Sequence, residues 1–197
     1  RGCVIKSPID FTIGLCREHA VIFPDSQTNY VEAYSLWTLI YAIARDMNQE
    51  LGNPPNVAGW PAYYQEPQYH ELWINSDTLP KRNKFSDNMI ANGYTRNGKK
   101  IVIDPIAFVS LLSDPADPNM LINDSLALLY MIDVSQATKD YLKKQILLSG
   151  QTNDAYWSTA WTTYLNDTSN TANKNIVLSR LKPLFKYIMD LSEYQLS

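Results

Sequence analysis

The chain has 197 residues, of which 45% are hydrophobic and 19% charged, and its formal net charge is -3. We expect a single helical domain over residues 1–197. Because the chain starts without a Met or a leader, we expect a fragment of a longer protein or a mature product whose start is missing. The charge balance excludes the basic stripe of a nucleic-acid interface, and no run of about 18 apolar residues is present to span a bilayer.

Two long helices are predicted first. One covers about residues 8–23, because Ser7 is a good cap, a proline suits the first helical position, and Pro24 ends the pattern. The other covers about residues 29–51, where apolar residues recur at three- and four-residue steps. Its apolar stripe is so wide that we expect most of the helix circumference to be buried. Gly52 is the expected C-cap.

A long loop is predicted over residues 53–75. It is too irregular for a helix or strand and too rich in Trp, Pro and Gly for a disordered linker. Loops of this length inside a compact domain are unusual and tend to be functional or specially packed. We expect an ordered loop held against the helical core by these structural anchors: Gly52, Pro54, Pro55, Gly59, Trp60, Pro61 and Arg82.

The remaining elements are mostly helices introduced by capping residues. Asn97 and Gly98 accept the positive φ of a tight turn, which predicts a short β-hairpin near residues 94–103. Helices are expected over about residues 76–92, 105–112, 118–132, 135–149, 153–165 and 174–191. Pro183 is expected to kink or restart the last of them. The fold class is therefore all-α, with about eight helices and one hairpin.

The loop carries a family resemblance. The run from Pro54 to Pro61 reads Pro-Pro-Asn-Val-Ala-Gly-Trp-Pro, and it is followed by Trp73, Ser76 and Arg82. This pattern resembles the signature of the bacterial domain of unknown function 1800 (DUF 1800) family. The likeness spans almost the whole chain and corresponds to the C-terminal part of a full-length member. The stretch 62–72 departs from the family, whose members have a short Gly-rich link there.

The resemblance implies a protein of the bacterial periplasm or a secreted protein, because many members are associated with the envelope. It also implies two partners: the N-terminal region of the same protein, or an envelope protein encoded by a neighbouring gene.

An aromatic cluster in the loop is the candidate binding site. Its members are Tyr63, Tyr64, Tyr69, His70 and Trp73, interspersed with amide side chains. Flat rings that stack and amides that hydrogen-bond hydroxyls are typical of a sugar-binding surface. The alternative, favoured for Trp60 and Trp73, is that the rings pin the loop to the core. For the tyrosines both interpretations stay open.

Catalytic and metal sites find weaker support. His70 beside Glu71 permits a general base, and the alternative is a solvent-facing histidine. Zinc needs four ligands, but the candidates Cys3, Cys16, His19 and His70 lack the paired spacing of such sites. The two cysteines could pair, although two buried free thiols are the favoured interpretation. No catalytic residue, metal or cofactor is therefore predicted.

Two pairs of carboxylates are candidates for acid–base chemistry. Glu66 and Glu71 flank the aromatic stretch, but acid–base work needs a fixed separation that the sequence does not define. Asp114 and Asp117 are expected to be turn and cap residues.

Three functions are compatible with these residues. The first is a non-catalytic interaction or scaffold module of a bacterial envelope or secreted protein. The second is a carbohydrate-binding module that uses the aromatic loop 63–73. The third is part of a hydrolase, in which His70 and Glu71 complete a site whose remainder lies in the missing N-terminal region.

Overall fold

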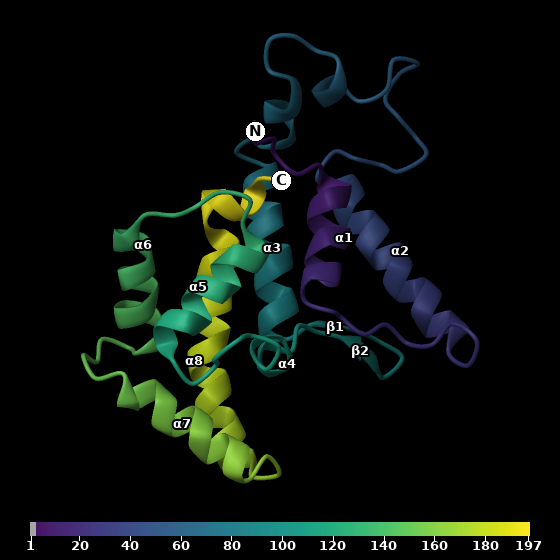
Figure 1. Cartoon of the computed structure of the whole chain (residues 1–197). Helices are drawn as coiled ribbons and strands as arrows, with labels where there is room; N and C mark the ends of the chain where they lie inside the picture. The colour runs from purple at the N-terminus through teal and green to yellow at the C-terminus, as the bar shows by residue number, and fades with distance from the viewer. Residues whose placement is uncertain (1–2) are drawn as a thin grey trace. The chain divides into compact units, whose positions relative to one another are not determined.

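The computed structural model describes residues 3–197 and confirms a mainly α-helical fold with one short hairpin (Figure 1). The helices of this part of the chain are α1 (Pro8–Glu18), α2 (Tyr30–Asp46), α3 (Thr78–Ala91), α4 (Pro105–Val109), α5 (Pro118–Leu129), α6 (Gln136–Tyr141), α7 (Ala155–Asn166) and α8 (Thr171–Asp190). The hairpin pairs β1 (Tyr94–Arg96) with β2 (Lys99–Ile101) in antiparallel register. Short 3₁₀ turns occur at Pro61–Tyr63, Tyr69–Trp73 and Ser192–Gln195.

The contacts divide the chain into two compact units. Unit 1 contains the chain up to Ile103 together with Gln195–Ser197, and unit 2 contains Asp104–Tyr194. The expectation of one domain over residues 1–197 stays a prediction.

In unit 1, α1, α2 and α3 pack against one another, and Figure 1 shows α1 and α2 side by side. Phe11, Leu36 and Phe85 are buried where these helices meet. The start of α1 is as predicted, since the Ser7 hydroxyl accepts a hydrogen bond from the backbone N–H of Asp10 at 3.2 Å and Pro8 follows it. These local signals therefore position the helical core of the unit.

The two helices that come before the loop, α1 and α2, both end earlier than predicted. The first helix ends at Glu18 rather than near residue 23, and the second ends at Asp46 rather than Leu51. The chain leaves each helix through a residue in the left-handed region, Ala20 with φ 46° and Asn48 with φ 74°. Gly52 is consequently part of the loop and not the C-cap.

The burial of α2 was predicted wrongly. Ala33, Leu36, Ile40 and Ala44 face the core, but the aromatic residues Tyr30, Tyr34 and Trp37 are 64%, 60% and 43% exposed. They form a second stripe, because residues four and three positions apart lie on one face of a helix. The wide apolar pattern was thus the sum of a core face and an exposed aromatic face.

The start of α3 also differs from the prediction. Ser76 does not cap it; the Asn75 side-chain oxygen accepts from the N–H groups of Asp77 and Thr78, each at 2.9 Å. The hairpin that follows is as predicted, with positive φ at Asn97 and Gly98.

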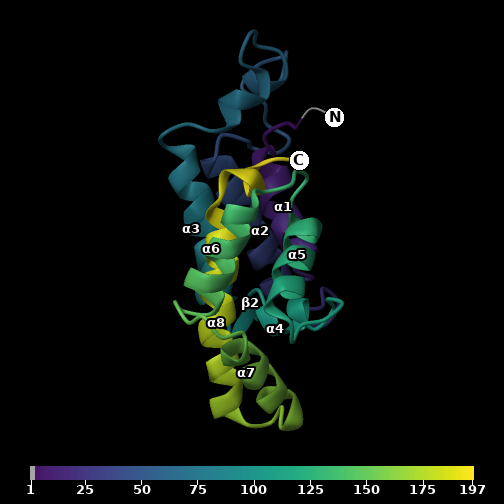
Figure 2. The same ribbon diagram turned by 60° about the vertical axis from the view of Figure 1, so that its left-hand side comes forward.

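Unit 2 is built around α8, with α7 beside it in Figures 1 and 2. Trp157 and Trp161 are buried and stacked, with ring centroids 5.7 Å apart, as expected for core residues. The Trp157 indole N–H donates to the carbonyl of Pro115 at 2.8 Å. The last helix begins at Thr171 rather than 174 and continues through Pro183 as one element.

The helix predicted over residues 135–149 is not a single α-helix in the structure. The α-helical part α6 is followed by a π-helical segment, Leu142–Leu147, and the chain then turns at Gly150.

Candidate functional site

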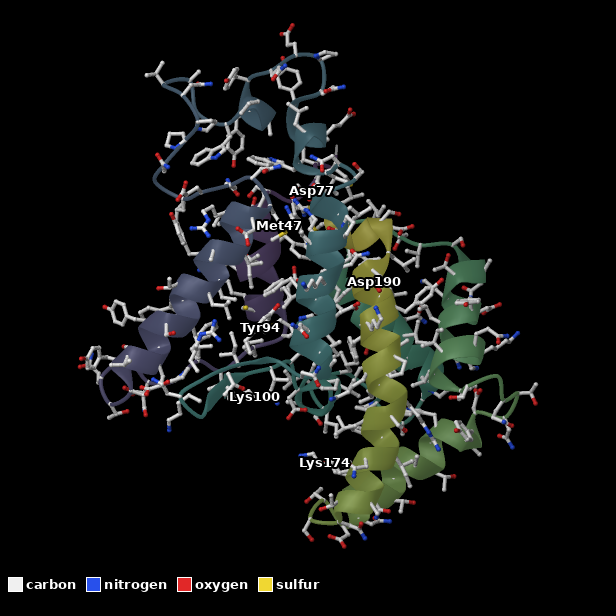
Figure 3. The ribbon with its side chains drawn as sticks, turned by 180° about the vertical axis from the view of Figure 1, so that it is seen from behind. Met47, Asp77, Tyr94, Lys100, Lys174 and Asp190 are labelled. Atoms are coloured by element: carbon white, nitrogen blue, oxygen red, sulfur yellow. The ribbon has the colours of Figure 1, made fainter. Side chains whose placement is uncertain are left out.

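The loop between α2 and α3 is ordered by its own hydrogen bonds. Figure 3 shows it projecting between the labelled residues Met47 and Asp77. The Asn56 carbonyl accepts from Gly59 N–H at 3.0 Å, and the Asn56 side chain accepts from Ala58 N–H at 2.8 Å. At its far end the Thr78 hydroxyl donates to the carbonyl of Trp73 at 3.0 Å. These bonds hold an irregular backbone in one shape.

The two indoles of the loop are buried to different degrees. Trp73 is only 4% exposed, whereas Trp60 is half-buried. Tyr63 lies between them and meets both rings edge-on, with centroid distances of 5.5 Å to Trp73 and 6.4 Å to Trp60. Trp73 therefore packs as a loop anchor, while the more exposed Trp60 retains ring surface that a ligand can reach.

The tyrosine hydroxyls are occupied within the loop and at its base. Tyr63 accepts a hydrogen bond from the Gln49 amide at 3.1 Å, and Tyr64 accepts one from the Asn56 amide at 2.7 Å. Tyr69 donates to the Glu66 carboxylate at 2.8 Å, and this bond raises the pKa of Tyr69. All three rings are exposed, so they contribute flat surface while their hydroxyls fix the loop.

His70 links the loop to the beginning of the chain. It is half-buried, and its Nδ1 accepts a hydrogen bond from the backbone N–H of Ile5 at 3.2 Å. The ring is therefore not the solvent-facing histidine of the alternative interpretation. A hydrolytic role for His70 and Glu71 stays a prediction.

Arg82 anchors segments other than the loop. Its fully buried guanidinium donates to the carbonyl of Lys6 at 2.8 Å and to the side-chain oxygen of Gln195 at 3.3 Å. Its Cζ lies 5.0 Å from the centre of the Phe11 ring, and burial lowers the pKa of Arg82 to about 10. This arginine ties both ends of unit 1 to α3.

A hollow of about 720 Å³ lies between the end of α2 and the loop. Its volume is within the range of small-molecule sites. Its polar lining consists of Arg45, Asn48, Glu50, Asn53 and Gln65. Its remaining lining consists of Pro54, Pro55, Trp60, Pro61, Ala62, Leu72 and Trp73. We refer to this space as the loop hollow.

The Glu50 carboxylate in the loop hollow is held in place. It accepts hydrogen bonds from the Asn53 amide at 2.8 Å and the Tyr41 hydroxyl at 2.9 Å. These bonds, the Asn53 bond first, lower the pKa of Glu50. A fixed, ionised carboxylate is an acceptor for ligand hydroxyl groups.

The loop hollow includes only part of the predicted site. Trp73 lines it, together with the predicted anchors Pro54, Pro55, Trp60 and Pro61, whereas Tyr63, Tyr64, Tyr69 and His70 do not. The sequence interpretation missed Arg45, Asn48 and Glu50. It placed Asn48 and Glu50 inside a longer helix, and it assigned Arg45, which is in the last turn of α2, to a polar helix face. The polar residues before Gly52 could have indicated the earlier helix end, because polar residues are uncommon in a buried helix end.

The cysteines and the Asp114–Asp117 pair do not form a site with the loop residues. Cys3 and Cys16 are free thiols, and burial raises the pKa of Cys16 to about 12. Within residues 3–197 no three His, Cys, Asp or Glu side chains gather as a metal site would require. Asp114 and Asp117 accept backbone hydrogen bonds from Ala116 and Asn119, as expected for turn and cap residues.

Comparisons with known proteins supply a family and no further relative. The model of a family described as "Protein of unknown function (DUF1800)" matches residues 1–196. No curated protein and no solved structure matches the chain. In the part of the chain that the structure describes, no helix combines the length and the apolar character needed to cross a bilayer.

Proposed function

Because the chain belongs to the DUF1800 family, whose description assigns no activity, we propose a function from the geometry of unit 1. Unit 1 is a non-catalytic module that binds a saccharide in the loop hollow. The envelope or extracellular setting that the family resemblance implies is part of the same proposal.

The observation that carries this proposal is the half-buried Trp60 ring in a hollow that also presents five polar side chains. Sugar rings have an apolar face that stacks on an indole and a rim of hydroxyl groups that need hydrogen-bond partners. Amides such as Asn48 and Gln65 both donate and accept, and therefore suit hydroxyl groups. Arg45 adds donors and Glu50 adds an acceptor.

Preorganisation supports the same ligand class. Two neighbours restrain Glu50, and the internal hydrogen bonds of Asn56 order the loop backbone beside Trp60. Groups that are already fixed lose little entropy when a ligand binds. The loop hollow therefore does not need to fold around its ligand.

A glycan array followed by titration calorimetry tests the proposal. Trp60→Ala and Gln65→Ala should each weaken binding of the strongest array ligand, the tryptophan change by about tenfold or more. Tyr69→Ala is the matched control, since Tyr69 is an exposed ring of the same loop outside the hollow.

Two results would contradict the loop hollow as the site. One is the absence of any bound glycan. The other is binding that survives Trp60→Ala but disappears with Tyr69→Ala, which would move the site to the outer aromatic surface of the loop.

The exposed aromatic face of α2 favours a second candidate, the interaction or scaffold module. Tyr30, Tyr34 and Trp37 are aromatic residues of the kind enriched at protein interfaces. The proposed partners are the N-terminal region of the same protein or a neighbour-encoded envelope protein. Mixing each purified partner with this chain should give a complex that Tyr34→Ala with Trp37→Ala weakens and that Leu128→Ala in α5 does not. No complex with either partner would end this proposal.

A further inference from the structure

A second hollow, of about 570 Å³, lies between α1 and α2 in unit 1. It shares no lining residue with the loop hollow. Its lining is largely apolar and includes Ile9, Ile13, Cys16, Trp37 and Ile40. We call it the helix hollow.

The helix hollow is open to solvent and has an apolar floor. Cys16 and Ile40 are 7% and 3% exposed, whereas Ile13, Trp37 and Leu51 at its edge are 38%, 43% and 60% exposed. Apolar side chains gathered around a concave surface are a feature of binding sites, because that surface is unfavourable in water. A volume of this size is within the range of small-molecule pockets.

Arg17 is the charged residue that lines the helix hollow. Its side chain is exposed and makes no hydrogen bond or ion pair with residues 3–197. The adjacent Glu18 is already paired with Lys6 at 3.1 Å, so that carboxylate is engaged elsewhere. The Tyr41 hydroxyl, also part of the lining, donates to Glu50. The hollow thus combines a large apolar surface with one available cation.

From this combination we propose that the helix hollow binds an amphiphile with a single carboxylate head and an alkyl chain, as in a fatty acid. The chain occupies the apolar surface between α1 and α2, and the carboxylate pairs with the Arg17 guanidinium. A guanidinium donates two parallel hydrogen bonds to the two oxygens of a carboxylate. An alcohol has only one oxygen and no charge, and a cationic head is repelled. The charge of the head is therefore the property that the site should select.

Titration calorimetry with three probes of equal chain length tests this selectivity. Decanoate should bind at one saturable site, decan-1-ol about tenfold more weakly, and decyltrimethylammonium more weakly still. Arg17→Gln should remove the preference for decanoate over decan-1-ol. Arg96→Gln, which alters an arginine outside the hollow, should preserve it.

A second variant tests the position of the alkyl chain. Ile13→Gln makes the partly exposed edge of the hollow polar without adding a charge that could pair with Arg17, and should weaken decanoate binding about tenfold. Leu128→Gln makes the same kind of change on α5 and should leave binding intact. Neither change should affect glycan binding, and Trp60→Ala should not affect decanoate binding.

Three outcomes would each overturn the proposal: equal affinity for decanoate and decan-1-ol, unchanged selectivity in Arg17→Gln, or decanoate binding that Ile13→Gln leaves unchanged. Binding that occurs only when decanoate is presented in a vesicle of neutral lipid would also overturn it, because the protein would then be binding a membrane surface.

Discussion

Arg82 is a buried cation whose acceptors are neutral oxygens, those of Lys6 and Gln195, and it forms no ion pair with residues 3–197. Its Nε has no hydrogen-bond acceptor in the same part of the chain. The guanidinium nevertheless spans two segments that are distant in sequence, with its flat face near Phe11. Arg82 therefore contributes to stability by linking two segments that are distant in sequence, more than by pairing with an opposite charge.

Removing that connection should be costly. Arg82→Ala should lower the free energy of unfolding by about 3–5 kcal/mol, because it removes two buried hydrogen bonds and opens space against Phe11. Arg82→Lys should lose less, since one ammonium group can still reach one of the two oxygens. Urea unfolding measures both. Equal stability of Arg82→Ala and the parent protein would show that the two hydrogen bonds contribute nothing.

His19 should make stability depend on pH. Burial lowers its pKa, and its Nδ1 lies 3.1 Å from the Leu15 carbonyl oxygen. The unfolded state then binds more protons at pH values between the folded pKa and the ordinary value near 6.5, so stability falls as the pH drops through that window. His19→Asn should flatten the difference in urea midpoint between pH 7.5 and about pH 5. An equally steep loss in the variant would exclude His19 as the cause.

Gly93 is the position where α3 turns into the hairpin. Its φ is +67°, and a Cβ there would lie 2.1 Å from the carbonyl oxygen of Ile101. Gly93→Ala should therefore destabilise by more than about 2 kcal/mol, because backbone strain and a backbone clash add. Gly98→Ala is the control: its φ is +80°, but the added Cβ would meet open space. Equal melting temperatures of the two variants would rule out the clash.

Elements with a local cause were predictable from the sequence. Ser7, Asp104 and Asp117 accept hydrogen bonds from the first turns of the helices they precede, and each is followed by proline. Asn97 and Gly98 likewise mark the hairpin turn. Such signals depend on a few neighbouring residues and were interpreted correctly.

The helix ends before the loop were not predictable in the same way. Ala20 leaves its helix with positive φ although alanine does not favour that region. Asn48 tolerates positive φ, but the apolar helical pattern continues past it to Leu51. Because the second helix ends early, Asn48 and Glu50 line the loop hollow instead of continuing a helix. The candidate site depends on that turn, and the predicted aromatic surface was therefore only part of it.

Unit 2 is an insertion in the chain of unit 1. The chain leaves unit 1 after Ile103 and returns to it at Gln195. The returning segment pairs with the beginning of the chain: Lys6 N–H donates to the Gln195 carbonyl at 2.8 Å, and Val4 and Ser197 exchange two backbone hydrogen bonds. Unit 1 is therefore closed by residues that follow unit 2.

Deleting residues 195–197 should consequently weaken unit 1. The change removes three backbone hydrogen bonds and one acceptor of Arg82, and should lower the stability of unit 1 by about 2–4 kcal/mol. Hydrogen exchange should quicken at the amide of Lys6, which loses its acceptor. Amides inside α7 serve as the reference, since their bonds lie within unit 2. Unchanged protection at Lys6 would mean that the returning segment does not hold the beginning of the chain in place.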